Sequence, residues 1–246
     1  MPTTGRVMMG LVGAGLLAQA LPAVTTWGPM RNRLFPALSG RGRPDHVALT
    51  FDDGPDPEST PRFLDMLDRL DVRATFFMLA ECAVREPALT RRVAAEGHEV
   101  ALHGWDHRNL LTRGPRSVHI SLARGRNELA EVTGSLPLLF RPAYGVLSGS
   151  ALLAAGRLGM RTVLWTGWGE DWTSRATASS VLDTLAPAIG PGATLVLHDS
   201  DITSAPGSWQ AALGALPQLV ANCRDRGLQV GRLADHGLAG DGVGHG

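Results

Sequence analysis

Short apolar runs alternate with longer stretches of helical periodicity along most of the chain. Several of the apolar runs, such as 72–78, are apolar almost throughout, which is typical of strands buried on both faces of a parallel sheet. Between them, apolar residues recur every three or four positions, as on one face of a helix. The pattern predicts strands at 46–53, 72–78, 98–103, 138–141, 161–165, 193–198 and 228–232. It predicts helices at 59–70, 87–96, 115–132, 150–158, 178–189 and 209–226.

This alternation predicts an α/β fold with about seven parallel strands. Strands separated by helices pair in parallel, and this many units without a long interruption favour a closed or nearly closed (β/α) barrel. An open, doubly wound sheet is the alternative architecture. In either fold the functional side chains gather at the C-terminal ends of the strands, so we expect the chemistry there.

The N-terminal part of the chain has a different character. Residues 1–25 contain an uncharged run after Arg6, and Ala18-Gln19-Ala20 resembles a signal-peptidase site. The run is long enough for a signal peptide or a short membrane anchor, and a helix packed on the domain is the alternative. We expect residues 26–44 to form a basic linker, 45–235 the barrel and 236–246 a flexible Gly-rich tail. This organisation predicts an extracytoplasmic protein that is either secreted or attached to a membrane through its N-terminal segment.

The composition indicates a single large domain and argues against a nucleic-acid-binding protein. The 246 residues fit one large domain, and a hydrophobic content of 44% supports a sizeable core. The 23 basic residues balance the 23 acidic ones, which argues against a nucleic-acid partner. Cys82 and Cys223 lack a metal-type spacing and are interpreted as two buried thiols, with a single bridge as the alternative.

Reactive side chains follow the predicted strands. The first strand ends in Asp52 and Asp53, and the third ends in His103, with His107 four residues later. Two histidines at this spacing can place both imidazoles on one side of a turn, and one carboxylate would complete a three-ligand set for zinc, cobalt or iron. The second carboxylate would then be free to accept a proton. A solvated Asp-Asp-Gly-Pro turn is the alternative interpretation.

Further candidates fall at other strand ends. His198 follows the sixth predicted strand and could carry a proton near neutrality, although a core histidine is the alternative. No nucleophile elbow surrounds any serine, so a serine triad is not expected. Four tryptophans fall near the same ends and could belong to the core or stack on sugar rings: Trp105, Trp165, Trp168 and Trp172.

Taken in order, these motifs resemble those of the polysaccharide deacetylases of carbohydrate esterase family four, which include chitin and peptidoglycan deacetylases. Thr50-Phe51-Asp52-Asp53-Gly54-Pro55 matches the first family motif residue for residue. The other four are matched by His103 and His107, by 141–145, by Asp171-Trp172 and by Val196-Leu197-His198. The resemblance implies a distorted (β/α) barrel of about seven strands.

The resemblance also implies roles for these residues. The metal ligands would be Asp53, His103 and His107, holding a divalent metal, zinc in the first place and cobalt or another as alternatives. The catalytic groups would be Asp52 as base, His198 as acid, Arg141, which orients the base, and Asp171, which partners the acid. Tyr144, whose backbone would help to bind the oxyanion, and Trp172 would bind substrate, together with Trp105 and Trp168 at the expected rim.

Three positions depart from the family pattern. Gly104 stands where a Ser or Thr is usual, Ala143 replaces a proline, and Trp168 stands where an acidic residue often occurs. None of them removes a metal ligand, the base or the acid. The sequence therefore predicts a metal-dependent hydrolase that removes N-acetyl groups from the amino sugars of a peptidoglycan- or chitin-like glycan. The alternatives are another amide or ester hydrolase, such as a xylan esterase or cyclic-imide hydrolase, and a catalytically silent glycan-binding relative.

Overall fold

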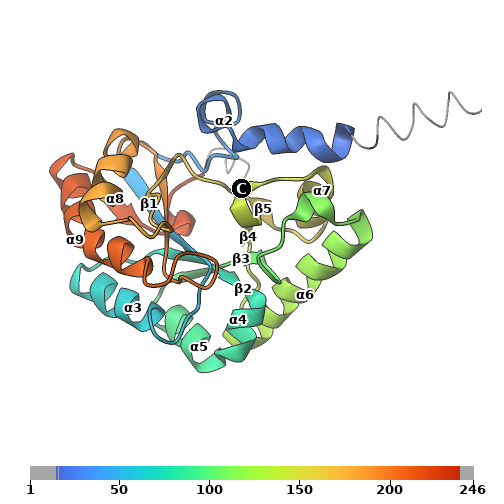
Figure 1. Cartoon of the computed structure of the whole chain (residues 1–246), viewed down its shortest axis with the longest axis horizontal. Helices are drawn as coiled ribbons and strands as arrows, with labels where there is room; N and C mark the ends of the chain where they lie inside the picture. Colours follow the sequence, from blue (N-terminus) through green and yellow to red (C-terminus); the bar gives the residue numbers. More distant parts are fainter. Residues whose placement is uncertain (1–14, 16, 239–246) are drawn as a thin grey trace, which may run out of the picture.

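The computed structural model describes residues 15 and 17–238, and its helices and strands alternate along the chain (Figure 1). The elements before the sheet are η1 (Leu21–Thr26) and α2 (Gly28–Leu34). The strands are β1 (His46–Asp52), β2 (Thr75–Leu79), β3 (Glu99–Gly104), β4 (Leu139–Phe140), β5 (Arg161–Thr162), β6 (Gly167–Trp168), β7 (Thr194–His198) and β8 (Gln229–Gly231). The main helices are α3 (Thr60–Arg69), α4 (Ala80–Arg85), α5 (Pro87–Ala95), α6 (Pro115–Thr133), α7 (Gly149–Arg157), α8 (Ala178–Leu185) and α9 (Trp209–Asp225).

The strands form one curled parallel sheet, a distorted (β/α) barrel as predicted. Its order is β5-β4-β3-β2-β1-β7-β6, and β8 pairs with the first half of β1. Every pairing in the described part of the chain is parallel. The helices surround the outside of the sheet in Figure 1. The two end strands of this order, β5 and β6, are consecutive in sequence, and the connector 163–166 runs between them.

Among the strands and α-helices that the structure describes from β1 onward, β6 and α4 were not predicted. The strand β6 has only two residues and includes a glycine, so it carries no periodic signal. The helix α4 follows β2 at once, in a stretch where we predicted no element. The strands β4 and β5 also have two residues each, fewer than the apolar runs that predicted them.

Strand β1 is buried along its whole length, and its alternation sorts its side chains between two cores. Val47, Leu49 and Phe51 join the large core between the sheet and the helices. Ala48 belongs to a smaller core inside the barrel, together with residues such as Phe77 and Val163. Because successive side chains of a strand alternate, Thr50 and Asp52 follow Ala48 to the inside of the barrel. The first of the two carboxylates is therefore brought to the barrel interior by the strand itself.

The cysteines are two separate buried thiols, as favoured by the sequence, on α4 (Cys82) and α9 (Cys223).

At the C-terminal end, the packed part of the chain extends further than predicted, because His236 and Leu238 are buried. The ring of His236 lies 2.8 Å, Nδ1 to Nδ1, from that of His46 at the start of β1. The remainder of the predicted tail, 239–246, lies outside the described residues.

Half of the apolar run that predicted a signal peptide or membrane anchor, residues 7–14 and 16, also lies outside the described residues. Among the helices that the structure describes, none is both long and apolar enough to cross a bilayer. The segment that we interpreted as a basic linker contains the helix α2. It contacts the barrel next to the connector 163–166, where the side chains of Arg31 and Asn32 bind the carbonyl oxygens of Trp165 and Thr166.

Candidate active site

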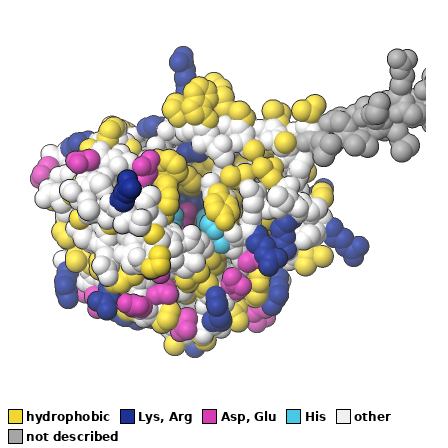
Figure 2. Space-filling view, viewed as in Figure 1, with side chains coloured by type: hydrophobic (Ala, Val, Ile, Leu, Met, Phe, Trp, Pro, Cys, Tyr) yellow, Lys and Arg dark blue, Asp and Glu magenta, His cyan; other side chains and the backbone are white. Residues whose placement is uncertain are grey.

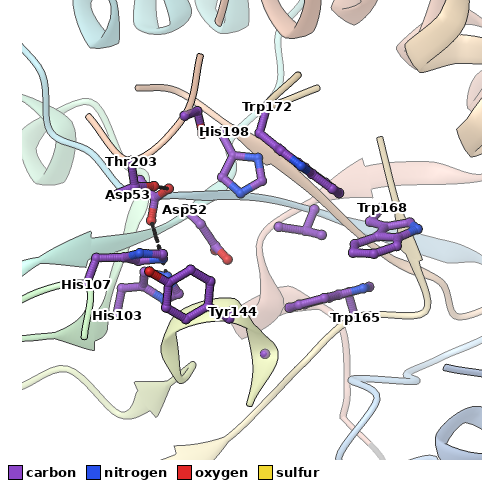
Figure 3. A pocket seen from close by; sticks show the side chains of 13 residues that line it. Asp52, Asp53, His103, His107, Tyr144, Trp165, Trp168, Trp172, His198 and Thr203 are labelled. Carbon is purple, nitrogen blue, oxygen red and sulfur yellow. Dashed lines mark hydrogen bonds and ion pairs between the residues drawn. The ribbon is translucent and has the colours of Figure 1, made fainter. Parts of the chain in front are cut away.

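The C-terminal ends of several strands line one cavity of about 270 Å³. Figure 2 shows histidine side chains in a hollow flanked by hydrophobic ones, and Figure 3 shows the residues that line it. The cavity is lined by Asp52, Asp53, His103, His107, Tyr144, Gly145, Trp165, Trp168, Trp172, Val196, His198, Thr203 and Ser204. Residues from all five of the predicted motifs thus meet here although they are far apart in sequence.

Asp52 and Asp53 both reach this cavity, which an extended strand alone would not allow. Successive side chains of a strand point to opposite faces. Asp53, however, has a φ of 79°, so the backbone leaves the extended conformation directly after β1. The turn that follows requires a glycine, because a Cβ at Gly54 would lie 2.4 Å from the buried carboxylate of Asp199. The Asp-Asp-Gly sequence therefore places both carboxylates at one site.

Asp53, His103 and His107 form a compact group with the character of a metal site. Oδ1 of Asp53 lies 3.3 Å from Nε2 of His103 and 3.4 Å from Nε2 of His107. Two ligand atoms that each lie about 2.1 Å from a tetrahedral ion are about 3.4 Å apart. The Oδ1 atom is buried and accepts no hydrogen bond, while Oδ2 accepts one from the hydroxyl of Thr203 (Figure 3). The donor set, its spacing and the unpartnered oxygen all fit a divalent cation.

The charges of this group also suit a cation. Burial lowers the pKa of His107 to about 4, although the carboxylate of Asp53 opposes this, so its imidazole is neutral at pH 7. Burial alone would raise the pKa of Asp53, but the close contact with the His103 imidazole and the electrostatic effect of the neighbouring histidines hold it well below its ordinary value. A neutral imidazole and an ionised carboxylate are the forms in which these side chains bind metals.

Asp52 is fixed by a fully buried arginine. NH1 of Arg141 donates to Oδ1 of Asp52 at 2.6 Å and to the hydroxyl of Thr50 at 2.8 Å. The guanidinium also lies 3.9 Å from the ring centroid of Phe77 inside the barrel. Burial lowers the pKa of Arg141 from its ordinary value, and the charge of Asp52 opposes that shift. Since Arg141 binds one carboxylate oxygen of Asp52, the other remains for a ligand in the cavity.

His198 lies beside Asp52 on the neighbouring strand, because β1 and β7 pair Asp52 with His198. Its Nδ1 is 3.0 Å from Oδ1 of Asp171, and its backbone N–H donates to Oδ2 of the same carboxylate at 2.7 Å. Burial would lower the pKa of His198, but Asp171, with smaller contributions from Asp53 and Asp52, raises it to about 10. With Nδ1 held by Asp171, Nε2 faces the cavity in Figure 3. A protonated imidazole next to a carboxylate can act as a proton donor.

Three tryptophans and a tyrosine form the walls. The rings of Trp165 and Trp168 are stacked with centroids 6.1 Å apart, and Trp172 lies 4.9 Å from Trp168. The ring of Tyr144 packs edge-on against His107 at 4.3 Å. Such exposed aromatic faces can stack on sugar rings.

Trp105 is not brought to this cavity. Its ring lies 3.5 Å from the guanidinium carbon of Arg124, and it lines a separate groove at the start of α6. Its position next to Asp106 and His107 in sequence suggested the rim, but β3 turns after Gly104, which has a φ of 119°.

Three residues of the site were missed in the sequence. Thr203, in the loop after β7, donates a hydrogen bond to Asp53. The only sign of this role in the sequence is its position five residues after His198. Thr50 is two residues before Asp52, so strand periodicity would have found it. Asp199 is buried under Gly54, accepts a hydrogen bond from the Thr60 hydroxyl, and has its pKa raised by burial to about 7.

Comparison with known proteins relates this geometry to a family. The family model described as polysaccharide deacetylase matches residues 39–163, which is half of the chain. The chain belongs to the polysaccharide deacetylase family. The matched segment contains Asp52, Asp53, His103, His107 and Arg141.

Three members of this family match the chain, and they differ in the share of their own length that is covered. A peptidoglycan-N-acetylglucosamine deacetylase of Listeria monocytogenes is 35% identical over 159 residues, which are 65% of this chain but only 33% of the relative. A chitooligosaccharide deacetylase of Sinorhizobium fredii is 33% identical over 198 residues, 78% of this chain and 91% of the relative. The solved Bc1960 peptidoglycan N-acetylglucosamine deacetylase is 29% identical with a TM-score of 0.74, covering 81% of this chain and 91% of that structure.

The departures from the family pattern have structural counterparts. Gly104 adopts a φ of 119°, in the region that L side chains rarely occupy, so a glycine suits this turn better than Ser or Thr. Ala143 is buried at the start of the turn η3 (Ala143–Gly145). Trp168 is 43% exposed and adds to the aromatic wall instead of placing a carboxylate there.

Proposed function

We propose that this chain is a divalent-metal-dependent deacetylase that hydrolyses the N-acetyl group of amino sugars in a glycan of the peptidoglycan or chitooligosaccharide type. One observation carries the proposal. A single cavity contains a metal-type group (Asp53, His103 and His107), a carboxylate held by a buried arginine (Asp52), and a protonated histidine (His198). Metal-assisted hydrolysis of an amide uses these three capacities together.

Asp53, His103 and His107 would hold the cation, with Thr203 orienting the carboxylate of Asp53. When bound, the cation would supply Lewis-acid chemistry, activating water and polarising the acyl oxygen. Zinc suits a set of two imidazoles and one carboxylate, and cobalt is the alternative.

The side chains around this group would carry the proton transfers. Asp52, held through Oδ1 by Arg141, accepts a proton through its other oxygen from the water that attacks the acyl carbon. As the oxyanion develops, the backbone N–H of Tyr144 donates a hydrogen bond to it. His198 then gives the proton on Nε2 to the departing amine nitrogen, while Asp171 stabilises the imidazolium through Nδ1. The C–N bond breaks, and the products are acetate and a free amino sugar.

The aromatic wall would bind the sugar. Trp168 and Trp172 present their rings to the cavity, and Tyr144 is 60% exposed beside His107. Stacking on these faces would leave the acetamido group of one residue pointing toward Asp52 and His198. Because the peptidoglycan that some relatives are named for is a cell-wall polymer, the proposal also implies an extracytoplasmic location.

The test is the release of acetate by the purified chain from N-acetylglucosamine oligomers and from peptidoglycan. The chain is first stripped with a chelator and then assayed with no metal, with zinc and with cobalt. We expect acetate release in both metal arms, with a matching gain of free amines, and none in the stripped arm. Acetylated xylan is the control substrate. Release from xylan alone would favour an esterase, and metal-independent release would contradict the proposal.

A further inference from the structure

The connector 163–166 lies where the sheet is interrupted, between β5 and β6 at the two ends of the strand order. Its carbonyl oxygens have side-chain partners at all four positions. Arg141 binds the oxygens of Val163 at 3.2 Å and Leu164 at 2.8 Å. The next two oxygens are bound by the segment before the barrel. NH2 of Arg31 donates to Trp165 at 2.6 Å, and Nδ2 of Asn32 donates to Thr166 at 3.2 Å.

These side chains take the place of a neighbouring strand. Buried backbone carbonyls need hydrogen-bond donors, and here the flanking strands are not paired with each other. The N-terminal segment also contributes backbone, because the Leu38 carbonyl accepts a hydrogen bond from the N–H of Leu164 at 2.7 Å. The gap in the barrel is therefore closed by residues that precede the segment matched by the family, which begins at 39.

Arg31 is an unusual residue for this purpose, since its side chain is charged and its exposed fraction is only 2%. It donates to the carbonyl oxygens of Thr25 and Trp165, and no carboxylate among the described residues lies within ion-pair distance of it. Burying a guanidinium without a counter-charge is unfavourable. A packing role could be filled by an apolar side chain, so the position of Arg31 is better explained by what its two hydrogen bonds hold in place.

The hydrogen bonds of Arg31 hold Trp165, which forms one wall of the cavity. The ring of Trp165 lines the cavity (Figure 3), and the guanidinium carbons of Arg31 and Arg141 lie 5.3 Å and 5.7 Å from its centroid. The far edge of the ring packs on the turn at Gly145, where a Cβ would lie 2.4 Å from it. That turn includes Tyr144. The indole thus contacts both the arginine that fixes Asp52 and the turn that carries the proposed oxyanion donor.

We propose that Arg31 is a positioning residue of the active site. Through the Trp165 carbonyl it fixes the indole, and through the indole the Tyr144-Gly145 turn and the Arg141–Asp52 pair. The side chain of Arg31, which lies in the segment that we interpreted as a linker, then supports the catalytic site. This inference rests on the proposed function, because it assigns Arg31 to the same reaction.

The test compares Arg31→Met with Arg33→Met on the full chain. Methionine approximates the length of the arginine stem without its donors, and Arg33 is an exposed arginine on the same helix, which makes it the matched control. We expect Arg31→Met to lower kcat about 10- to 100-fold, since small displacements of reacting groups have effects of this size. KM should change less, and zinc content should not change, because the ligand group lies at the C-terminal ends of β1 and β3 and in the loop after β3. Arg33→Met should match the unmodified chain.

Two further measurements distinguish a positioning role of Arg31 from a general destabilisation of the fold. Arg31→Ala should regain part of its kcat when guanidinium is added at millimolar concentration, far below its denaturing range, whereas Arg33→Ala should not respond. Hydrogen exchange followed by mass spectrometry should show faster exchange at 142–148 and 163–166 in Arg31→Met, with β2 and β7 unchanged. An unchanged kcat in Arg31→Met, or a loss equal to that of Arg33→Met, would overturn the inference.

Failure of the proposed function would look different. In that case the unmodified chain would release no acetate from any glycan, whatever the state of Arg31. The exchange experiment would still report whether Arg31 holds the Trp165 wall and the Tyr144 turn. Faster exchange with an unchanged kcat in an active enzyme would show a purely structural role and would also overturn the inference.

Discussion

His107 and His198 face the same cavity with similar exposure, 14% and 18% of their side chains, yet their protonation differs widely. The pKa of His107 is lowered to about 4 and that of His198 is raised to about 10. His107 shares one oxygen of Asp53 with His103. His198, by contrast, has both oxygens of Asp171 to itself.

This difference shows how one residue type can have two protonation states in one cavity. The carboxylate of Asp53, which two imidazoles share, does not offset the burial of His107, so His107 remains neutral and free to bind a cation. A carboxylate dedicated to one imidazole keeps it charged, and the proton is then available for a leaving group. Burial alone would have lowered the pKa of both histidines.

The largest effect should come from removing His198, the proposed proton donor. We expect His198→Gln to reduce kcat by about 10³-fold, within the range usual for a general acid. Zinc content should stay at that of the unmodified chain, because His198 is not part of the ligand group. Steady-state acetate release and metal analysis of the same preparation check this. Loss of zinc together with activity would indicate that His198 binds the metal and would contradict the contrast between the two histidines.

A smaller effect should follow from weakening the carboxylate that keeps His198 charged. Asp171→Asn removes the largest contribution that raises the pKa of His198, so that pKa falls. A general acid works only while protonated, so activity is lost as the pH rises through its pKa, and the variant should lose activity at a lower pH. We expect kcat at pH 7 to drop about 10- to 100-fold, and pH profiles of kcat for both forms measure the shift. An alkaline limb that stays in place would contradict the assigned pairing.

The proposed metal site of Asp53, His103 and His107 can be tested by changing Thr203. Thr203→Val removes the hydrogen bond to Oδ2 of Asp53 while keeping a similar shape. Partners of this kind typically change metal affinity by about 10- to 100-fold, and we expect a loss of that size. At saturating zinc the rate should be within about tenfold of normal. Competition with a chromophoric chelator gives the affinity, and Thr203→Ser, which keeps the hydroxyl, should behave normally.

The smallest effect should come from the aromatic wall. Trp168 is 43% exposed, and its ring packs against Trp165 and Trp172. We expect Trp168→Ala to raise KM for glycan oligomers several-fold, in line with about 1 kcal/mol for loss of an aromatic contact, and to leave kcat unchanged. An effect mainly on kcat would mean that Trp168 acts on the reacting groups.

The residues that could be predicted share one property, which is that local pattern determines their position. Asp52 follows an alternating apolar strand, and His103 ends another, so the rule for strand ends placed them together. His198 needed only the same rule. The barrel itself followed from the alternation of elements, because each strand and helix buries its own apolar face.

The residues that could not be predicted depend on contacts between distant segments. Arg31 lies in a stretch with the composition of a basic linker, and its burial follows from carbonyls that β5 and β6 leave unpaired. Thr203 matters only because its loop folds over Asp53. Trp105 carried the same local signal as the wall tryptophans, but the turn at Gly104 directs it to another groove. Nothing local in the sequence specifies these long-range contacts.

The central claim is that two adjacent aspartates have separate roles, and the paired variants Asp52→Asn and Asp53→Asn test it most directly. Each replaces a carboxylate by an amide of the same shape, and both zinc content and acetate release are measured on each. We predict that Asp52→Asn keeps its zinc and loses about 10³-fold or more in kcat. We predict that Asp53→Asn loses both zinc and activity. Near-normal turnover in Asp52→Asn, or zinc bound with unchanged affinity in Asp53→Asn, would contradict the account.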